Sequence, residues 1–164
     1  MKITGFRVVG LTAPYIRPGG NPKNPSNGVR NCVWLCLATE DGKCGWGEVY
    51  AGCYATEVCI AALQRLCSAI VGLDLLQAEH ILADLRYQHR YWAMRGIGAQ
   101  CTSAIEGALW DIVGQVQQKP LWALLGDGRL RPLVLYASAG DSAPVQRALR
   151  GLLRRLRRPP RPRR

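Results

Sequence analysis

Three segments near the start of the chain have the alternating, β-branched pattern that is typical of strands. They are Lys2–Ala13, Asn31–Thr39 and Lys43–Tyr50. Glu40-Asp41-Gly42 joins the second segment to the third, and it predicts a hairpin turn because glycine adopts a positive φ at little cost. Segments connected in this way predict a three-stranded antiparallel meander.

Apolar residues at helical spacing follow these strands. They predict helices over Glu57–Val71, Gln77–Tyr91 and Ala99–Gln117. The third helix has the widest apolar face, formed by Cys101, Ala104, Ile105, Ala108, Leu109, Ile112 and Val116. Pro120 either ends this helix or begins a short one at Leu121–Leu125. Three strands followed by helices predict an α+β fold, with a meander and then a helical bundle.

The connection between the first two strands, Pro14–Gly28, is long and rich in proline and glycine. Hairpin loops usually have about two to five residues, and longer ones are often functional lids or disordered segments. From the residues alone, a lid and a floppy loop are equally compatible with this segment.

The net charge of +11 lies mostly at the C-terminal end of the chain. Residues 1–140 carry 13 basic and 10 acidic side chains, whereas residues 141–164 carry nine arginines and one aspartate. The body of the chain is therefore nearly neutral, and the basic character belongs to the tail.

The tail Ser142–Arg164 has three interpretations. We favour an out-of-frame or otherwise aberrant end, because nine Arg, four Pro, two Ala and one Gly make up most of it, and these are the amino acids of GC-rich codons. The second is an amphipathic helix, in which Leu149, Leu152, Leu153 and Leu156 share one face. The third and least favoured is a basic arm that binds nucleic acid.

The seven cysteines include no C-x-x-C pair, so we expect core thiols rather than a metal site. The first residues lead into a strand pattern rather than a signal-peptide run. No apolar stretch approaches the length of about 20 residues that spans a bilayer. We therefore expect a cytoplasmic protein without a membrane span.

Three motifs together resemble the enolase superfamily, in its mandelate racemase and muconate lactonizing branch. They are DGKCGWGE at Asp41–Glu48, SAIEGALWDIVG at Ser103–Gly114 with PLWALLG at Pro120–Gly126, and YAS at Tyr136–Ser138. The resemblance implies a capping domain over 1–132 and the first barrel strand over 133–140, whereas the Arg/Pro-rich tail 141–164 departs from the family. We expect this tail to be helical at first and then disordered.

The motif residues also have structural interpretations. Gly45 and Gly47 leave room for close backbone approach beside Trp46. Trp110 is expected to add a large buried aromatic surface. We expect Asp111 to form a structural cap or pair, and Glu48 and Glu106 are likewise expected to be structural rather than catalytic, since a carboxylate needs a neighbouring partner or a metal for chemistry.

The resemblance also implies a role for two mobile loops. In this family the loops of the capping domain close the mouth of a TIM-like barrel and help to select the substrate. They map onto Tyr15–Gly28 and Tyr50–Tyr54, so the substrate-contact candidates are Tyr15, Ile16, Tyr50 and Tyr54.

The family's chemistry is abstraction of a proton alpha to a carboxylate, with Mg²⁺ held by three acidic residues and a Lys or His base, all on the barrel. This chain has no lysine after Lys119 and no glutamate after Glu106. The resemblance therefore implies no catalytic residue, metal ligand or cofactor within residues 1–164. We expect a truncated protein that is inactive alone.

Two alternatives stay open. The chain can be a stand-alone interaction module whose basic arm binds nucleic acid or an anionic surface. It can also be completed as an enzyme by another chain that carries the barrel. A severed domain is further expected to self-associate through an exposed apolar face.

Overall fold

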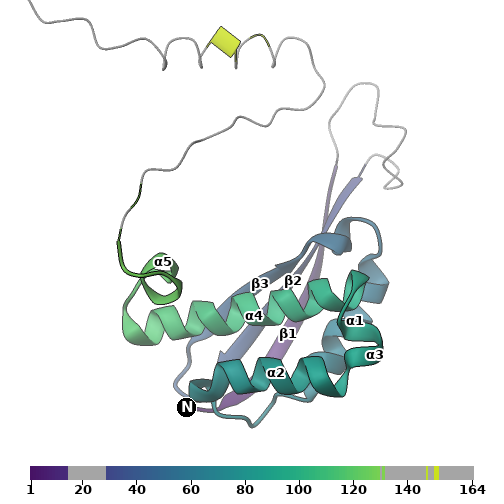
Figure 1. Cartoon of the computed structure of the whole chain (residues 1–164). Helices are drawn as coiled ribbons and strands as arrows, with labels where there is room; N and C mark the ends of the chain where they lie inside the picture. Colours follow the sequence, from purple (N-terminus) through teal and green to yellow (C-terminus); the bar gives the residue numbers. More distant parts are fainter. Residues whose placement is uncertain (15–28, 130, 132–146, 148–149, 152–164) are drawn as a thin grey trace, which may run out of the picture. The chain divides into compact units, whose positions relative to one another are not determined.

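The computed structural model describes residues 1–14, 29–129, 131, 147 and 150–151. Its sheet has three antiparallel strands in the order β1-β2-β3 (Figure 1). These are β1 (Ile3–Pro14), β2 (Val29–Thr39) and β3 (Cys44–Val49). The predicted meander is confirmed, and each strand begins and ends within two residues of its predicted bounds.

The turn between β2 and β3 is closed by the residues that predicted it. Gly42 has φ of 81°, in the left-handed region that glycine adopts without strain. The Asp41 carboxylate accepts hydrogen bonds from the Lys43 ammonium and, at 2.5 Å, from the Thr39 hydroxyl. The bond from Lys43, followed by that from Thr39, lowers the pKa of Asp41 to about 2.

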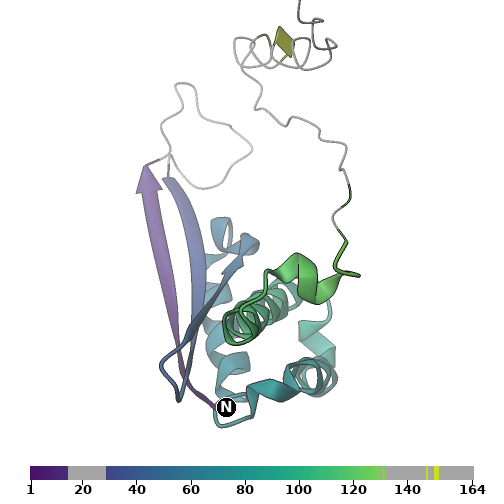
Figure 2. The ribbon, with the colours of Figure 1, turned by 90° about the vertical axis from the view of Figure 1, so that its left-hand side faces the viewer.

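Two 3-10 helices and five α-helices follow β3 in the described part of the chain. They are η1 (Tyr50–Cys53), α1 (Thr56–Ser68), η2 (Leu75–Gln77), α2 (Ala78–Gln88), α3 (Arg90–Ala93), α4 (Gly96–Gln117) and α5 (Leu121–Leu125). The helices lie on one side of the sheet and leave its other face bare (Figure 2). The predicted α+β fold is confirmed, as is the short helix after Pro120.

Three predicted helix limits are wrong. The third predicted helix begins at Gly96 rather than Ala99. The second predicted helix stops at Gln88, because His89 leaves helical geometry and its carbonyl accepts the first backbone bonds of α3 instead. The first predicted helix ends at Ser68 rather than Val71. There the N–H groups of Ala69 and Ile70 bond to carbonyls three residues back, which tightens the turn.

The core lies between the inner face of the sheet and the helices. The predicted face of α4 is buried from Cys101 to Ile112, but Val116 is 39% exposed. Val116 follows Gln115, whose side-chain amide donates to the carbonyl of Cys44 at the start of β3. Trp110 is only half-buried and lines a surface pocket, so its expected place in the core is wrong.

The cysteines match the expected core role only in part. Cys59, Cys67 and Cys101 are fully buried and Cys36 nearly so, whereas Cys44 is exposed and Cys32 and Cys53 are half-buried. The described residues contain no group of three or more His, Cys, Asp or Glu side chains that could hold a metal ion.

β3 and α4 approach each other at backbone distance. A Cβ placed on Gly45 would lie 2.1 Å from the carbonyl oxygen of Ala108, and one on Gly47 would lie 2.0 Å from that of Ala104. The glycines are therefore required for this contact, as their motif predicts.

Two polar side chains of α4 satisfy the outer edge of β3. The Trp46 N–H donates to Asp111 Oδ2 at 2.9 Å, and Gln115 Nε2 donates to the Cys44 carbonyl at 2.7 Å. Asp111 and Gln115 are four residues apart and so lie on one face of the helix. The predicted structural role of Asp111 is confirmed, and these bonds cover an edge strand that would otherwise present unpaired groups.

Replacing Asp111 with alanine is expected to lower the free energy of unfolding by about 1–2 kcal/mol, because it removes a charge-assisted acceptor from the Trp46 N–H. Urea unfolding measured by far-UV circular dichroism checks this value. The matched control is Asp84→Ala, at an exposed position of α2, which should change stability by less than about 0.5 kcal/mol. Equal losses for the two variants would contradict the role of the Asp111 bond.

The chain divides into two units, Met1–Gly128 and Arg129–Arg164. The predicted boundaries at 132 and 140, the barrel strand at 133–140 and the tail leucines lie outside the described residues. Within the second unit, Arg147, Arg150 and Gly151 have helical backbone.

Candidate functional site

Of the four predicted substrate contacts, Tyr15 and Ile16 lie outside the described residues. Tyr50 begins η1 and Tyr54 directly follows it, with exposed fractions of 62% and 56%. Their rings meet edge to face, with centroids 6.1 Å apart and an interplanar angle of 65°. The structure therefore brings the two described candidates together as an exposed aromatic pair.

The pair is held by contacts of η1 with the sheet and with α4. A Cβ on Gly52 would lie 2.7 Å from a methyl group of Val33, so only glycine allows η1 to pack this closely on β2. The Ala51 N–H donates to Gln100 Oε1 at 2.7 Å, and the Thr56 hydroxyl donates to the Gly52 carbonyl at 2.7 Å. These contacts fix the backbone beneath the two exposed rings.

Arg30 lies beside this pair and was missed by the sequence analysis. It is exposed at the start of β2, where its neighbour across the sheet is Ala13, next to the point at which residues 15–28 leave the sheet. The pKa of Arg30 is raised, first by its interaction with Cys53, and then by a hydrogen bond with the Cys32 side chain. A side-chain hydrogen bond with Tyr50 is the main cause that raises the pKa of Tyr54.

We name this group the lid-end cluster: Arg30, Cys32, Tyr50, Cys53 and Tyr54. Within the described part of the chain, no carboxylate lies at ion-pair distance from Arg30. An exposed guanidinium flanked by phenol groups can donate several hydrogen bonds to an anion. The cluster includes no histidine or carboxylate, and so it has the means to bind a negative group but no strong general base.

The carboxylates expected to be structural are distributed over the fold. Glu106 accepts from Arg86 at 2.8 Å and joins α4 to α2, as a structural role predicts. Glu48 is exposed on β3. The two histidines do not form a catalytic pair: His80 is exposed on α2, and His89 stacks edge to face on Trp92.

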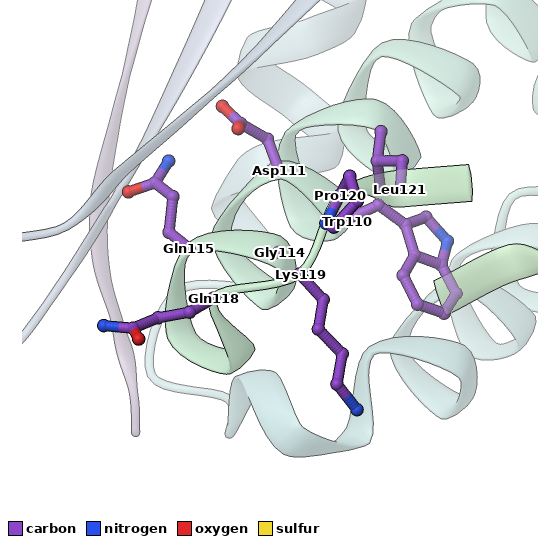
Figure 3. Close-up of a pocket in the computed structure, with 8 residues that line it drawn as sticks. All are labelled: Trp110, Asp111, Gly114, Gln115, Gln118, Lys119, Pro120 and Leu121. Atoms are coloured by element: carbon purple, nitrogen blue, oxygen red, sulfur yellow. The ribbon is translucent and has the colours of Figure 1, made fainter. Parts of the chain in front are cut away.

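A second surface feature lies where α4 passes into α5. A pocket of about 400 Å³ is lined by Trp110, Asp111, Gly114, Gln115, Gln118, Lys119, Pro120 and Leu121 (Figure 3). In Figure 3, Asp111 and Gln115 point toward the sheet and Lys119 points away from it. Beside this pocket are exposed apolar side chains, which we name the α4–α5 patch: Val116, Leu121, Trp122 and Leu125, each 39–61% exposed.

Of the helices in the described part of the chain, none combines the length and apolar character that a bilayer crossing requires.

Curated proteins similar to this chain include a D-mannonate dehydratase and a D-galactonate dehydratase family member. The chain is 27% identical over 142 residues to a D-mannonate dehydratase of Novosphingobium aromaticivorans, covering 87% of this chain and 31% of the relative. It is 32% identical over 115 residues to a D-galactonate dehydratase family member of Pseudarthrobacter chlorophenolicus, covering 69% and 27%. The chain thus spans about a third or less of the length of these relatives.

Solved structures agree with this relationship. A member of the enolase superfamily from Agrobacterium tumefaciens superposes with a TM-score of 0.66 at 27% identity, over 76% of this chain and 37% of that one. A protein from Burkholderia xenovorans, solved with magnesium and fumarate, gives a TM-score of 0.64 at 25% identity, over 79% and 28%.

The family model for the mandelate racemase / muconate lactonizing enzyme N-terminal domain matches residues 25–126, which include β2, β3 and all helices from α1 to α5. This range contains both the glycine-mediated contact of β3 with α4 and the lid-end cluster. The chain therefore belongs to the mandelate racemase and muconate lactonizing family of the enolase superfamily, as its N-terminal domain.

Proposed function

We infer that this domain closes the mouth of a magnesium-dependent active site carried by a second, catalytic domain. The single observation that carries this proposal is the lid-end cluster, in which Arg30 has no acidic partner among the described residues and lies beside two exposed phenols. The cluster would hold a charged group of the substrate while the domain excludes water.

The proposed substrate is a sugar acid, because the similar proteins include a D-mannonate dehydratase and a member of the D-galactonate dehydratase family. The proposed reaction begins with removal of the proton alpha to its carboxylate. Magnesium would stabilise the charge that develops on the carboxylate, and its ligands would belong to the catalytic domain. The capping domain contributes binding and orientation, which raise the rate without a catalytic residue of its own.

The α4–α5 patch is the proposed docking surface for the catalytic domain, whether that domain belongs to the same polypeptide or to another chain. Trp122 and Leu125 are large apolar side chains three positions apart in α5, yet they are 50% and 61% exposed. Exposed apolar patches on soluble domains often mark interaction sites.

Because the seven cysteines are free thiols, we also propose the reducing cytoplasm as the location of the protein.

A domain exchange tests this function. Residues 1–128 would replace the capping domain of the Novosphingobium D-mannonate dehydratase, and turnover of a panel of sugar acids would be measured with Mg²⁺. We expect measurable dehydration by the chimaera. Arg30→Gln should lower kcat/KM by about 10- to 100-fold, mainly through KM, which corresponds to the loss of a hydrogen-bonded charge pair.

Arg65→Gln is the matched control, because Arg65 is an exposed arginine of α1 outside the lid-end cluster. It should leave kcat/KM within about twofold, since isolated surface changes have small effects. A chimaera that folds and binds magnesium yet turns over no sugar acid would overturn the proposed function. Equal losses of kcat/KM in the two arginine variants would show that Arg30 has no specific role in substrate binding.

A further inference from the structure

Two cysteines lie one diagonal step apart on neighbouring strands of the sheet. Ala38 of β2 pairs with Cys44 of β3, and Cys36, two residues earlier, pairs with Trp46. Gly45 packs on α4, and successive residues of a strand point to opposite faces. Cys44 and Cys36 therefore share the face of the sheet that carries no helix (Figure 2). The twist of a sheet shortens one of its two diagonals, and a side-chain hydrogen bond joins these two thiols, so theirs is the short one.

The two thiols differ in exposure although they share a face. Cys44 is the first residue of β3 and is exposed, whereas Cys36 is only 7% exposed. The strand register explains this difference, because Arg7 of β1 and Trp46 of β3 lie directly opposite Cys36 on either side. An oxidant dissolved in water therefore reaches Cys44 first. Cys36 is a second thiol that is shielded from water but in contact with the first.

Arg7 is a positive charge next to the shielded thiol. Burial is the main cause that raises the pKa of Cys36, followed by the hydrogen bond with Cys44, whereas the charge of Arg7 lowers it. Cys36 therefore keeps its proton in the reduced protein. Within the described part of the chain, no carboxylate lies at ion-pair distance from Arg7. Its charge can thus favour the thiolate that Cys36 becomes when it attacks an oxidised neighbour.

We propose that Cys44 and Cys36 are a peroxide-sensitive thiol pair, in which Cys44 is oxidised first and Cys36 then closes a disulfide between β3 and β2. The Cys44 thiolate attacks one oxygen of a hydroperoxide, and the O–O bond breaks. Cys44 becomes a sulfenic acid, and the other oxygen leaves with a proton as water or an alcohol.

The second step joins the two strands. The Cys36 sulfur attacks the Cys44 sulfur, so that an S–S bond forms and the S–O bond of the sulfenic acid breaks. The hydroxide that leaves takes up the proton of Cys36 as water. The two thiols together lose two electrons, and the peroxide gains them.

The other thiols of the chain are less suited to this reaction. Cys59 and Cys101 are also joined by a side-chain hydrogen bond, but both are fully buried, out of reach of a dissolved oxidant. Cys32 and Cys53 are half-buried, and each of them interacts with Arg30. The pair that joins β2 to β3 is therefore expected to be oxidised first.

Closing the disulfide requires a small shift at the end of the hairpin. Diagonal residues of an antiparallel pair are about 7–8 Å apart, whereas the Cα atoms of a disulfide are usually about 4.4–6.8 Å apart. Cys44 begins β3 beside the turn, and the hydrogen bond from Gln115 to its carbonyl is expected to lengthen as it moves. A disulfide near this geometric limit and close to water is readily reduced, so it would be transient in a reducing compartment.

Peptide mapping after mild oxidation tests the proposal. The full 164-residue chain is reduced, treated with a small excess of hydrogen peroxide, blocked with iodoacetamide and digested with trypsin. Trypsin separates the two thiols, because it leaves Cys36 in residues 31–43 and Cys44 in residues 44–65. We expect these peptides to be linked, with a mass two hydrogen atoms below their sum. Dithiothreitol should separate them again.

Fragmentation of the linked peptides identifies the bonded sulfurs, since the same two peptides contain Cys32 and Cys53. A link between Cys36 and Cys44 is the expected product. A main product that links Cys32 to Cys53 overturns the proposal, and so does oxidation that leaves Cys44 unmodified. A disulfide-bonded dimer on a non-reducing gel does the same, because the oxidised thiol would then react with a second molecule rather than with Cys36.

Substitutions separate the two steps. Cys36→Ala removes the second thiol, so the sulfenic acid of Cys44 should persist and its labelling by dimedone should rise at least fivefold. Arg7→Gln should slow disulfide closure by about threefold or more, because it removes the charge that favours the Cys36 thiolate. Equal dimedone labelling of Cys44 in the Cys36→Ala and unsubstituted chains would exclude Cys36 as the second thiol.

Cys32→Ala is the matched control, since Cys32 is a cysteine of the same strand, four residues before Cys36 and on the same face. It should leave the yield of the link between Cys36 and Cys44 unchanged. Circular dichroism establishes that each variant is folded. Cys44→Ser, at an exposed position, provides a second test if Cys36→Ala fails to fold, because it should abolish the link between the two peptides.

Discussion

Gly47→Ala is expected to destabilise the domain by about 3 kcal/mol or more, a large part of the stability of an ordinary domain. The added Cβ would lie 2.0 Å from the carbonyl oxygen of Ala104 and 2.8 Å from its carbonyl carbon. Both atoms belong to the backbone of α4, so no rotamer change relieves the contact. β3 and α4 must separate, which also stretches the bond from Trp46 to Asp111. Urea unfolding followed by circular dichroism measures the loss.

Gly107→Ala is the matched control for this substitution. Gly107 is an exposed residue of α4, and nothing lies within 4 Å of a Cβ placed there. Because alanine has the higher helix propensity, this variant should gain about 0.5–1 kcal/mol. The contact between β3 and α4 would be refuted as a requirement of the fold by a Gly47→Ala protein that loses less than about 1 kcal/mol.

The strands and the turn could be predicted from the sequence because their signals are local. Gly42 adopts the positive φ that the Glu40-Asp41-Gly42 turn requires, and the pattern of β2 matches its burial. The helix ends were less predictable. The break at His89 depends on its carbonyl, which accepts hydrogen bonds from the N–H groups of Trp92 and Ala93. No local sequence pattern predicts these bonds. The position of Trp110 depends likewise on the return of the chain through Pro120 and Leu121.

The candidate site was predictable only in part for a similar reason. Tyr50 and Tyr54 came from the family resemblance, and their ring contact supports their grouping without testing their role. Arg30 meets Cys53 across 23 positions of sequence, through the packing of Gly52 on Val33. One signal was available: Arg30 is the only charged residue of β2, and it stands beside the long loop. A lone charge at the start of an apolar strand merits attention when a lid candidate adjoins it.

Raising the pH from 8 to 10 is expected to remove about 1.4 kcal/mol of stability through Cys67 alone. Burial, followed by the charge of Cys101, raises the pKa of Cys67 from 9.0 to about 12. Above pH 9 the unfolded chain loses this proton while the folded chain keeps it, so the unfolded state is favoured as the pH rises. The contribution of the Cys67 thiol to the free energy of unfolding is intact below pH 9. It falls by about 4 kcal/mol as the pH approaches 12.

The comparison with Cys67→Ala isolates this contribution. The variant has a lower stability at pH 8 because it leaves a small cavity, but its further loss between pH 8 and 10 should be smaller than that of the unsubstituted chain by about 1.4 kcal/mol. Ile70→Val serves as the control, since it removes a buried methyl group from the same core without removing a titratable group, and it should therefore leave the pH dependence of stability unchanged. Parallel pH profiles for the unsubstituted chain and Cys67→Ala would mean that water reaches the interior between α1 and α4. The thiols of Cys67 and Cys101 would then be solvated in the folded domain, and the packing of this core would be looser than its fully buried side chains indicate.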